Sequence, residues 1–250
     1  MDTAYRLVTI PPSHYCEKAR WGLEHFGVGY TEERHPPMLH YAACRRAGGG
    51  RTAPVLVTDA GVYPDSTEIL HFLDRRHANH ARLYPDHPDG RAAVDDLEDL
   101  FDLKLGPHTR RVAYFHLLKH RDLFLGSVLI GASGGERFVF RASLPVIRGL
   151  MRRGMRINAE SADRSLQRIR EIFTTVDGIL TDGRSYLVGG SFTAADLTFS
   201  ALAAPVLLPR GYGAPLPSLV DLPDDMLKVV EEMRSSAPGQ FAMRMYRDHR

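Results

Sequence analysis

The chain has 250 residues, 44% hydrophobic and 25% charged, which is typical of a globular protein with room for one large domain or two modest ones. The formal net charge of +2 does not favour a nucleic-acid-binding protein, and no apolar run approaches the roughly 18–20 residues that a membrane-spanning helix needs. The N-terminus lacks the pattern of a secretory signal, and two cysteines, Cys16 and Cys44, cannot build a disulfide framework. We therefore expect a cytoplasmic protein that binds neither nucleic acid nor membranes.

The first part of the chain alternates strand and helix signals. Residues 5–10 alternate in the manner of a β-strand, and Pro11 ends the strand because proline cannot donate to a strand ladder. Apolar positions within residues 14–26 fall on one face of a helix. Ser13 stands where the N-cap is expected, and Gly27 is placed to end the helix.

Three more strands and a second helix follow this unit. Residues 28–34 indicate a polar strand, and residues 38–50 a loop or a short irregular helix. Residues 53–63 indicate two strands joined by a turn, and Asp65 begins the next helix. This order predicts an α/β domain over residues 1–78.

The remainder of the chain is helical in pattern. Residues 79–88 are expected to form a linker, and residues 89–250 an all-helical domain. Helices are expected over residues 92–120 (long or broken), 161–180, 193–207 and 222–233. The helix over 193–207 is nearly all apolar and should lie in the core, and the last helix should follow a cap at Asp221. Residues 120–160 give no interpretable pattern.

The start of the first helix is the first candidate site. A helix N-terminus carries partial positive charge and free N–H groups, so a thiolate placed there is stabilised. Residues 13–16 have the spacing of a C-x-x-C motif with serine first. The Ser13 hydroxyl can donate a hydrogen bond to a thiolate that arrives with a ligand, or it can simply cap the helix. Cys16 is either a small buried hydrophobe or a redox-active thiol.

Two more short motifs suggest a peptide-like ligand. Ala53–Pro54 opens a strand, and a cis bond there would expose the Ala53 backbone to an extended ligand, although a trans bond is the commoner case. Ser66 offers a hydroxyl and an N–H to an anion, and Asp65 can hold an ammonium group; simple capping is the alternative. Together Asp65 and Ser66 match a ligand that carries both an α-amino and an α-carboxylate group.

These motifs resemble a known family. Residues 13–21, Ala53–Pro54 and Asp65–Ser66 are similar to the N-terminal domain of glutathione transferases, nearest to the bacterial-type branch with serine or cysteine at the first-helix position. Residues 186–196 resemble the capping-box segment of the family's helical domain, where Thr193 caps a helix and Asp196 reaches back. Members with a catalytic tyrosine place it near the end of the first strand, where this chain has Thr9.

The resemblance implies a thioredoxin-like domain with a four-stranded mixed sheet, followed by an all-helical domain, usually in a homodimer. It also implies a glutathione site in the first domain and an electrophile pocket facing the second, for which aromatic residues such as Tyr114 or Phe115 are candidates. The implied glutathione contacts are Ser13 with the sulfur, Ala53 and cis Pro54 with the cysteinyl part, Asp65 and Ser66 with the γ-glutamyl group, and Arg51 with the glycyl carboxylate.

The expected function is that of a glutathione transferase, which activates the glutathione thiol for attack on a small hydrophobic electrophile or a peroxide. Two alternatives stay open: a non-catalytic binding or interaction protein with this fold, and a thiol–disulfide exchanger that uses Cys16. No metal is expected, because His116 and His120 are four residues apart but lack a third ligand.

One basic stretch remains unassigned. Residues 137–156 carry arginines and no acidic residue, namely Arg137, Arg141, Arg148, Arg152, Arg153 and Arg156. The stretch is either a solvated helix face or a rim that steers an anionic substrate. Few aromatic residues interleave with these arginines, which argues against RNA binding.

Overall fold

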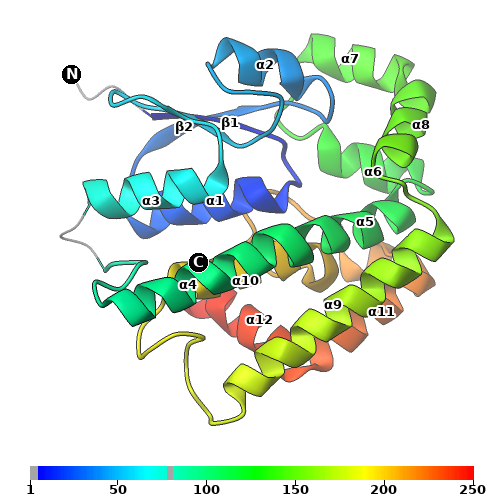
Figure 1. The fold of residues 1–250 in the computed structure, drawn as a ribbon. Helices are drawn as coiled ribbons and strands as arrows, with labels where there is room; N and C mark the ends of the chain where they lie inside the picture. The colour runs from blue at the N-terminus through cyan, green and yellow to red at the C-terminus, as the bar shows by residue number, and fades with distance from the viewer. Residues whose placement is uncertain (1–4, 78–80) are drawn as a thin grey trace.

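A computed structural model describes residues 5–77 and 81–250. Residues up to 76 alternate strands and helices (Figure 1). The elements are β1 (Tyr5–Thr9), α1 (His14–His25), β2 (Tyr30–Arg34), α2 (His40–Arg46), β3 (Val55–Val57), β4 (Val62–Tyr63) and α3 (Ser66–Arg76). The segment left open between loop and irregular helix thus contains the helix α2.

The four strands form one mixed sheet in the order β2-β1-β3-β4. Strand β1 pairs in parallel with β2 and antiparallel with β3, and β3 pairs antiparallel with β4. Side chains alternate across a strand, so Leu7 packs with α1 and α3 on one face, whereas Val8 packs with Cys44 of α2 on the other. The thioredoxin-like architecture expected for this domain is confirmed.

Helix α1 begins and ends as the sequence predicts. Ser13 is its N-cap, and the Ser13 side chain accepts a hydrogen bond from the backbone N–H of Cys16. After the last helical residue, Gly27 has a φ of +63°, a left-handed conformation that glycine adopts at little cost. The chain then enters β2.

The rest of the described chain is helical. Residues 79 and 80 of the expected linker, and residue 78 before them, lie outside the described residues. The helices are α4 (Pro88–Leu100), η1 (Phe101–Leu105), α5 (Gly106–Leu117), α6 (Arg121–Val128), α7 (Gly134–Ala142), α8 (Leu144–Gly154), α9 (Ala159–Leu180), α10 (Ala194–Leu207), η2 (Leu219–Asp221), α11 (Asp224–Ser235) and α12 (Ala237–His249). The two-part fold expected from the sequence is therefore present.

The long helix expected over residues 92–120 is continuous but irregular. Its middle, η1, is a π-helical turn in which the Gly106 N–H bonds to the Phe101 carbonyl, five residues back. Pro107 follows immediately and has no N–H to donate. The carbonyl of Asp102, next in this five-residue register, is thus left without its backbone donor.

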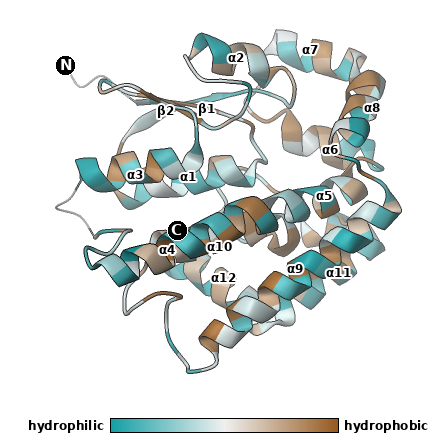
Figure 2. Cartoon of the chain, viewed as in Figure 1, coloured by the Kyte–Doolittle hydropathy of each residue, from teal (hydrophilic) through white to brown (hydrophobic). Residues whose placement is uncertain are grey.

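Helix α10 is the buried core helix that the sequence predicts, since every residue in it except Pro205 is buried. Asp196 reaches back to accept hydrogen bonds from the N–H and the hydroxyl of Thr193, both at 2.8 Å. Helix α9 covers the core with one face, and its ribbon in Figure 2 alternates hydrophilic and hydrophobic residues accordingly.

The segment without an interpretable pattern folds into three short helices, α6, α7 and α8. They share a hydrophobic cluster centred on Phe124, Phe140 and Met151, which reaches Leu39 of the first domain. His35 joins the two domains here, because its ring nitrogens lie 2.9 Å from Glu33 and 2.5 Å from Glu136.

One expected helix start is wrong. The helix predicted to follow a cap at Asp221 begins at Asp224 with Pro223 as its N-cap, and Asp221 lies in the turn η2. Proline is favoured where a helix begins and has no N–H for a preceding turn, so the boundary lies two residues later. No described helix is both long and apolar enough to cross a membrane.

Candidate active site

A cavity of about 400 Å³ lies between the two domains, at the start of α1. Its lining residues come from both domains and include Ser13, His14, Tyr15, His40, Arg51, Ala53, Arg110, Tyr114, Met151, Met155, Pro205 and Leu208. The structure therefore brings Ser13, Arg51, Ala53 and Tyr114, four of the residues singled out in the sequence, to one cavity.

Ser13 is half-buried at the wall of this cavity. Its oxygen accepts a hydrogen bond of 3.4 Å from the N–H of Cys16, which fixes the side chain at the helix terminus. Among the described residues, none accepts the Ser13 hydroxyl proton. The hydroxyl is thus free to donate a hydrogen bond to a bound anion. The positive end of the α1 dipole would stabilise the same anion.

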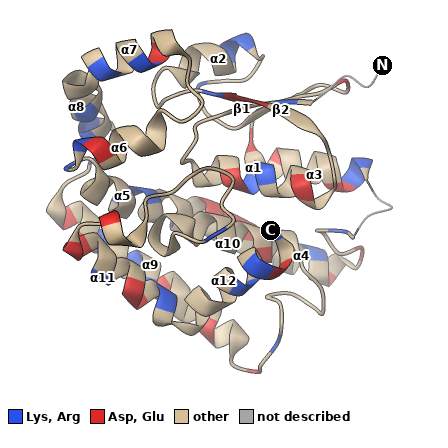
Figure 3. Ribbon diagram, turned by 180° about the vertical axis from the view of Figure 1, so that it is seen from behind, with Lys and Arg blue, Asp and Glu red and all other residues tan. Residues whose placement is uncertain are grey.

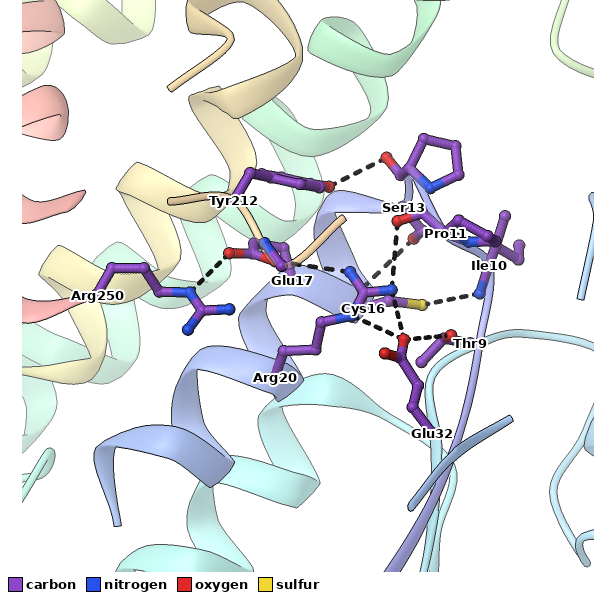
Figure 4. A network of polar contacts seen from close by, with 12 residues as sticks. Thr9, Ile10, Pro11, Ser13, Cys16, Glu17, Arg20, Glu32, Tyr212 and Arg250 are labelled. Atoms are coloured by element: carbon purple, nitrogen blue, oxygen red, sulfur yellow. Dashed lines mark hydrogen bonds and ion pairs between the residues drawn. The ribbon is translucent and has the colours of Figure 1, made fainter. Parts of the chain in front are cut away.

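The loop that carries Ser13 is held from beneath by buried polar contacts (Figure 4). The Arg20 guanidinium donates to the carbonyl of Pro11 at 3.2 Å and to Glu32 at 2.8 Å. The hydroxyl of Tyr212 donates to the carbonyl of Pro12 at 3.1 Å. These contacts fix the turn between β1 and α1 against both the sheet and the helical domain.

Thr9 has no free hydroxyl for a ligand, although it stands where tyrosine-type relatives are expected to carry their catalytic group. It is fully buried, and its hydroxyl donates to Glu32 at 2.6 Å. Burial tends to raise the pKa of Glu32, but Arg20 and the hydrogen bonds to this carboxylate lower it below its usual value. Glu32 therefore stays ionised and accepts the hydrogen bond of the Thr9 hydroxyl.

Neither cysteine is accessible. Cys16 is fully buried, and its sulfur accepts a hydrogen bond from the N–H of Ile10 at 3.4 Å. Burial raises the pKa of the Cys16 thiol, against a smaller opposite effect of Arg20, and burial raises the pKa of Cys44 to about 11. Both side chains are free thiols that are held protonated at neutral pH.

The cavity wall is electropositive. Arg51 and Arg110 line it, and no Asp or Glu is among its lining residues. Within the described residues Arg110 pairs with no carboxylate, although it is half-buried on α5. An unpaired guanidinium inside a cavity attracts anionic groups.

His14 and Tyr15 connect the start of α1 to the helical domain. Nε2 of His14 lies 2.9 Å from the carbonyl oxygen of Gly106, so the neutral ring donates its proton there. Burial, with a further effect of Arg110, lowers the pKa of His14 to about 3. Burial raises the pKa of Tyr15, so its hydroxyl stays protonated at the cavity wall.

The ring of His40 is a further polar feature of the cavity wall. The residue is buried, and no described residue hydrogen-bonds to its Nδ1. Burial lowers the pKa of His40 to about 4, against an opposite effect of the Arg51 backbone. A buried, unpaired ring nitrogen beside Arg51 offers a hydrogen bond to a bound ligand. Sequence reasoning missed both His40 and Arg110, because His40 is marked by its burial and Arg110 by the lack of a carboxylate partner among the described residues.

The remaining sequence candidates, Pro54, Asp65, Ser66 and Phe115, are not among the residues that line the cavity. The Ala53–Pro54 bond is cis, and Pro54 is buried behind Ala53. Asp65 is exposed and caps α3 by accepting from the N–H groups of Thr67 and Glu68, and Ser66 is buried at the first helical position. Phe115 is outside the lining and packs against Lys119, whose Nζ lies 3.8 Å from the ring centroid.

One group of described residues has the spacing of a metal site: ligand atoms of His71, Asp95 and Glu98 lie within 4.8 Å of one another. Arg91 lies among them, 3.2 Å from Nδ1 of His71 and 3.3 Å from Asp95. Glu98 pairs with Lys18 at 2.8 Å. The side-chain cations of Arg91 and Lys18 therefore already pair with the carboxylates that a metal ion would bind.

Comparisons with known proteins bear on this site. Residues 7–81 match the family model described as "Glutathione S-transferase, N-terminal domain". No curated protein matches the sequence significantly. Glutathione transferase GSTFuA3 from Phanerochaete chrysosporium superposes with a TM-score of 0.62 at 16% identity, over 100% of this chain and 98% of that one.

Two bacterial structures carry ligands. A theta class glutathione S-transferase from Xanthomonas axonopodis pv. citri, with glutathione bound, has a TM-score of 0.56 at 20% identity over 96% of this chain and 97% of its own. A glutathione S-transferase from Methylobacterium radiotolerans, in complex with glutathione sulfonate, has a TM-score of 0.55 at 19% identity over 96% and 95%. The chain therefore has the glutathione transferase fold, with an N-terminal domain that matches this family over residues 7–81.

Proposed function

We propose that this protein is a glutathione transferase that uses Ser13 to hold the glutathione sulfur as a thiolate. The observation that carries the proposal is the Ser13 hydroxyl, which lines the inter-domain cavity at the N-terminus of α1 with its proton uncommitted among the described residues. A hydroxyl donor, the helix dipole and a nearby guanidinium all favour the charged form of a thiol.

The rest of the tripeptide would lie along the first domain. Ala53 lines the cavity, and its backbone would pair with the cysteinyl part. The N-terminus of α3, with Ser66 and Asp65, would hold the γ-glutamyl group. Arg51 would bind the glycyl carboxylate, and the unpaired Nδ1 of the neutral His40 ring would accept a hydrogen bond from an N–H of the tripeptide.

The electrophile would enter from the side of the helical domain. There the wall is formed by Tyr114, Met151, Met155 and Leu208, which are largely apolar. The sulfur would attack an electrophilic carbon or a peroxide placed against this wall, and thiolate formation raises the nucleophilicity at neutral pH. Tyr114 is the aromatic residue that we retain for this pocket.

The alternative of a thiol–disulfide exchanger has less support. An exchanging cysteine needs access and a lowered pKa, whereas Cys16 is fully buried and its thiol pKa is raised by burial. A non-catalytic binding protein would use the same cavity and differ only in turnover.

Calorimetric titration of the pure protein with reduced glutathione and with S-hexylglutathione tests the proposal. Binding of both, tighter for the hexyl form, is expected because the hexyl chain would cover the apolar wall. Absence of binding by either at millimolar concentration would rule out the glutathione mechanism. Binding without turnover in a broad screen of electrophiles and peroxides would favour the non-catalytic alternative.

We also infer a homodimer in the cytoplasm. The dimer rests on the resemblance, and the reducing location is consistent with the two free, buried cysteines. Light scattering on the eluting peak of a size-exclusion column measures the mass directly, and a monomer at micromolar concentration would contradict the first inference.

A further inference from the structure

A second cavity, of about 590 Å³, also borders α5, and basic side chains make up most of its lining. We call it the basic cavity. Its lining residues are His108, Arg111, Arg152, Arg153, Arg156, Ile157, Asn158, Ser161, Arg164, Ser165 and Arg168. They come from α5, from the end of α8 and the loop after it, and from the first turns of α9. Basic residues of α8 and α9 are blue in Figure 3.

The basic stretch seen in the sequence therefore divides in space. Arg152, Arg153 and Arg156 enter the basic cavity. Arg137 and Arg141 border a different hollow on α7. The fold adds three arginines from α5 and α9 to the first group, so the positive charge is gathered from segments that are distant in sequence.

Most of this charge has no internal partner. Arg164 pairs with Glu160, and Arg168 lies 2.6 Å from Glu171, both on the exposed surface of α9. No Asp or Glu is among the lining residues. Among the described residues, none supplies a carboxylate within ion-pair distance of the remaining four arginines, which are Arg111, Arg152, Arg153 and Arg156.

Among the arginines of the basic cavity, Arg111 is held in place by hydrogen bonds. It is half-buried and donates to the hydroxyl of Ser165 at 2.8 Å and to the carbonyl of Met155 at 3.1 Å. Both acceptors are neutral, so they orient the guanidinium without cancelling its charge. Burial, with smaller effects of the nearby Arg110, Arg156 and Arg164, lowers the pKa of Arg111, and a bound anion would offset the repulsion among these cations.

The chain turn at Arg156 contributes one of these side chains. The φ of Arg156 is +51°, in the left-handed region where glycine is favoured over residues with a side chain. A long charged side chain is nevertheless present at this position, and it lines the cavity. This conformation ends α8, because the N–H of Ile157 bonds to the carbonyl of Arg152 at 2.8 Å, and it leaves the Arg156 side chain at the cavity.

The lining also restricts the kind of anion. Ile157 is its one apolar side chain, and His108 its one ring, so there is little surface for an apolar body or for base stacking. Planar guanidinium groups from several directions match the oxygen atoms of phosphate groups, which accept paired hydrogen bonds. We propose that the basic cavity binds a small polyanion with two or more phosphate groups, at a site separate from the cavity that contains Ser13.

The test is calorimetric titration of the full chain with inorganic pyrophosphate, tripolyphosphate and ATP. The double variant R153Q/R156Q removes two charges from the basic cavity, and R137Q/R141Q removes two from the same basic stretch outside it. We expect wild-type binding and about tenfold or greater weakening in R153Q/R156Q only, because each lost charge-assisted hydrogen bond weakens binding. Unchanged binding of S-hexylglutathione in both variants would show that the fold is intact.

The source of the phosphate groups follows from the same titrations. Similar affinity for tripolyphosphate and ATP would assign a bare polyphosphate, whereas tighter binding of ATP would assign a nucleotide. Absence of binding by wild type at millimolar concentration would overturn the proposal. Equal loss in both double variants would overturn it too, as would much tighter binding of a short RNA that depends on all four of the substituted arginines.

Discussion

The hydroxyl of Tyr15 donates a hydrogen bond to the carbonyl oxygen of Asp102 over 2.7 Å. This carbonyl is available because it belongs to the π-helical turn and Pro107 supplies no N–H to it. The first turn of α1 thus bonds to the irregular turn of the helical domain. One wall of the candidate active site is therefore positioned by a local irregularity in a helix 87 residues away in sequence.

The close approach at this point predicts a strict need for glycine at position 106. A Cβ on Gly106 would lie 2.4 Å from the Tyr15 hydroxyl oxygen and 3.2 Å from Nε2 of His14. We expect G106A to lower the free energy of unfolding by about 1–3 kcal/mol in chemical denaturation, because both side chains are hydrogen-bonded and must move. G178A on α9, where nothing lies within 4 Å of the added methyl, should be neutral or stabilising. Equal stability of the two variants would contradict this account.

Ser13 provides the direct test of the proposed chemistry. Ser13→Ala removes the hydroxyl donor but leaves the helix dipole, so we expect turnover with an electrophile to fall roughly a hundredfold. The dissociation constant of glutathione should change much less, since most of its contacts lie elsewhere. Steady-state kinetics and calorimetry separate the two effects, and equal loss in both would assign Ser13 a binding role alone.

Arg110 should affect the ionisation of the bound thiol. Its guanidinium has no carboxylate partner among the described residues and lines the same cavity as Ser13. In Arg110→Gln we expect the pKa of protein-bound glutathione to rise by on the order of one unit, as measured by the ultraviolet absorbance of the thiolate against pH. Arg110→Lys retains the charge and should restore most of the effect. A thiol pKa that is the same in all three proteins would exclude this role.

The buried cluster around Lys18 predicts a large stability effect. Nζ of Lys18 lies 2.8 Å from Glu98 and 2.6 Å from Asp102, and it is fully buried. Burial alone would lower the pKa of Lys18, but the two carboxylates raise it above its usual value, so the cation is retained. Lys18→Met should lower the free energy of unfolding by about 3–5 kcal/mol, since both carboxylates are left in the interior without a counter-charge.

The matched control for this change is Lys119→Met. Lys119 pairs with Asp225 over 3.5 Å, and both side chains are about half exposed. Such pairs contribute about 0–1 kcal/mol, so we expect little change in the denaturation midpoint. A loss at Lys18 as small as that at Lys119 would mean that the buried cluster is not held by its charge.

His14 predicts how stability depends on pH. Its pKa is lowered in the folded protein from 6.5 to about 3. Between about pH 6.5 and pH 3, His14 is therefore protonated in the unfolded chain and neutral in the folded protein. The free energy of unfolding should thus decrease as the pH falls from about 6.5 toward 3. His14→Gln should unfold with a weaker dependence on pH over this range, which thermal melts at stepped pH will measure. Parallel curves for the two proteins would contradict the assignment.

Sequence reasoning succeeded where the signal is local. The cap at Ser13 and the reach of Asp196 back to Thr193 each involve residues only three positions apart, so spacing alone predicts them. The buried α10 was readable because its apolar residues cover every face.

The features that the sequence did not predict depend on contacts between residues that are distant in the chain. The π-helical turn keeps an ordinary helical pattern and is distinguished only by Gly106 packing against α1. Arg110 and His40 became candidates only once burial and missing partners were known. The helices α6 to α8 pack mainly against one another and against Leu39, so their short amphipathic faces had no recognisable context.

Helix α10 has one further consequence. It packs against α1 on one side and against α4, α5, α11 and α12 on others, and it includes the small residues Ala201, Ala203 and Ala204. Its thickness therefore sets the separation between the first domain and the outer helices, to within the size of a methyl group. Because Pro205 and Leu208 at its end border the candidate active site, the width of that site is fixed by a helix that is buried at every residue except Pro205. Substitutions that widen α10 should thus change ligand selection without touching a ligand.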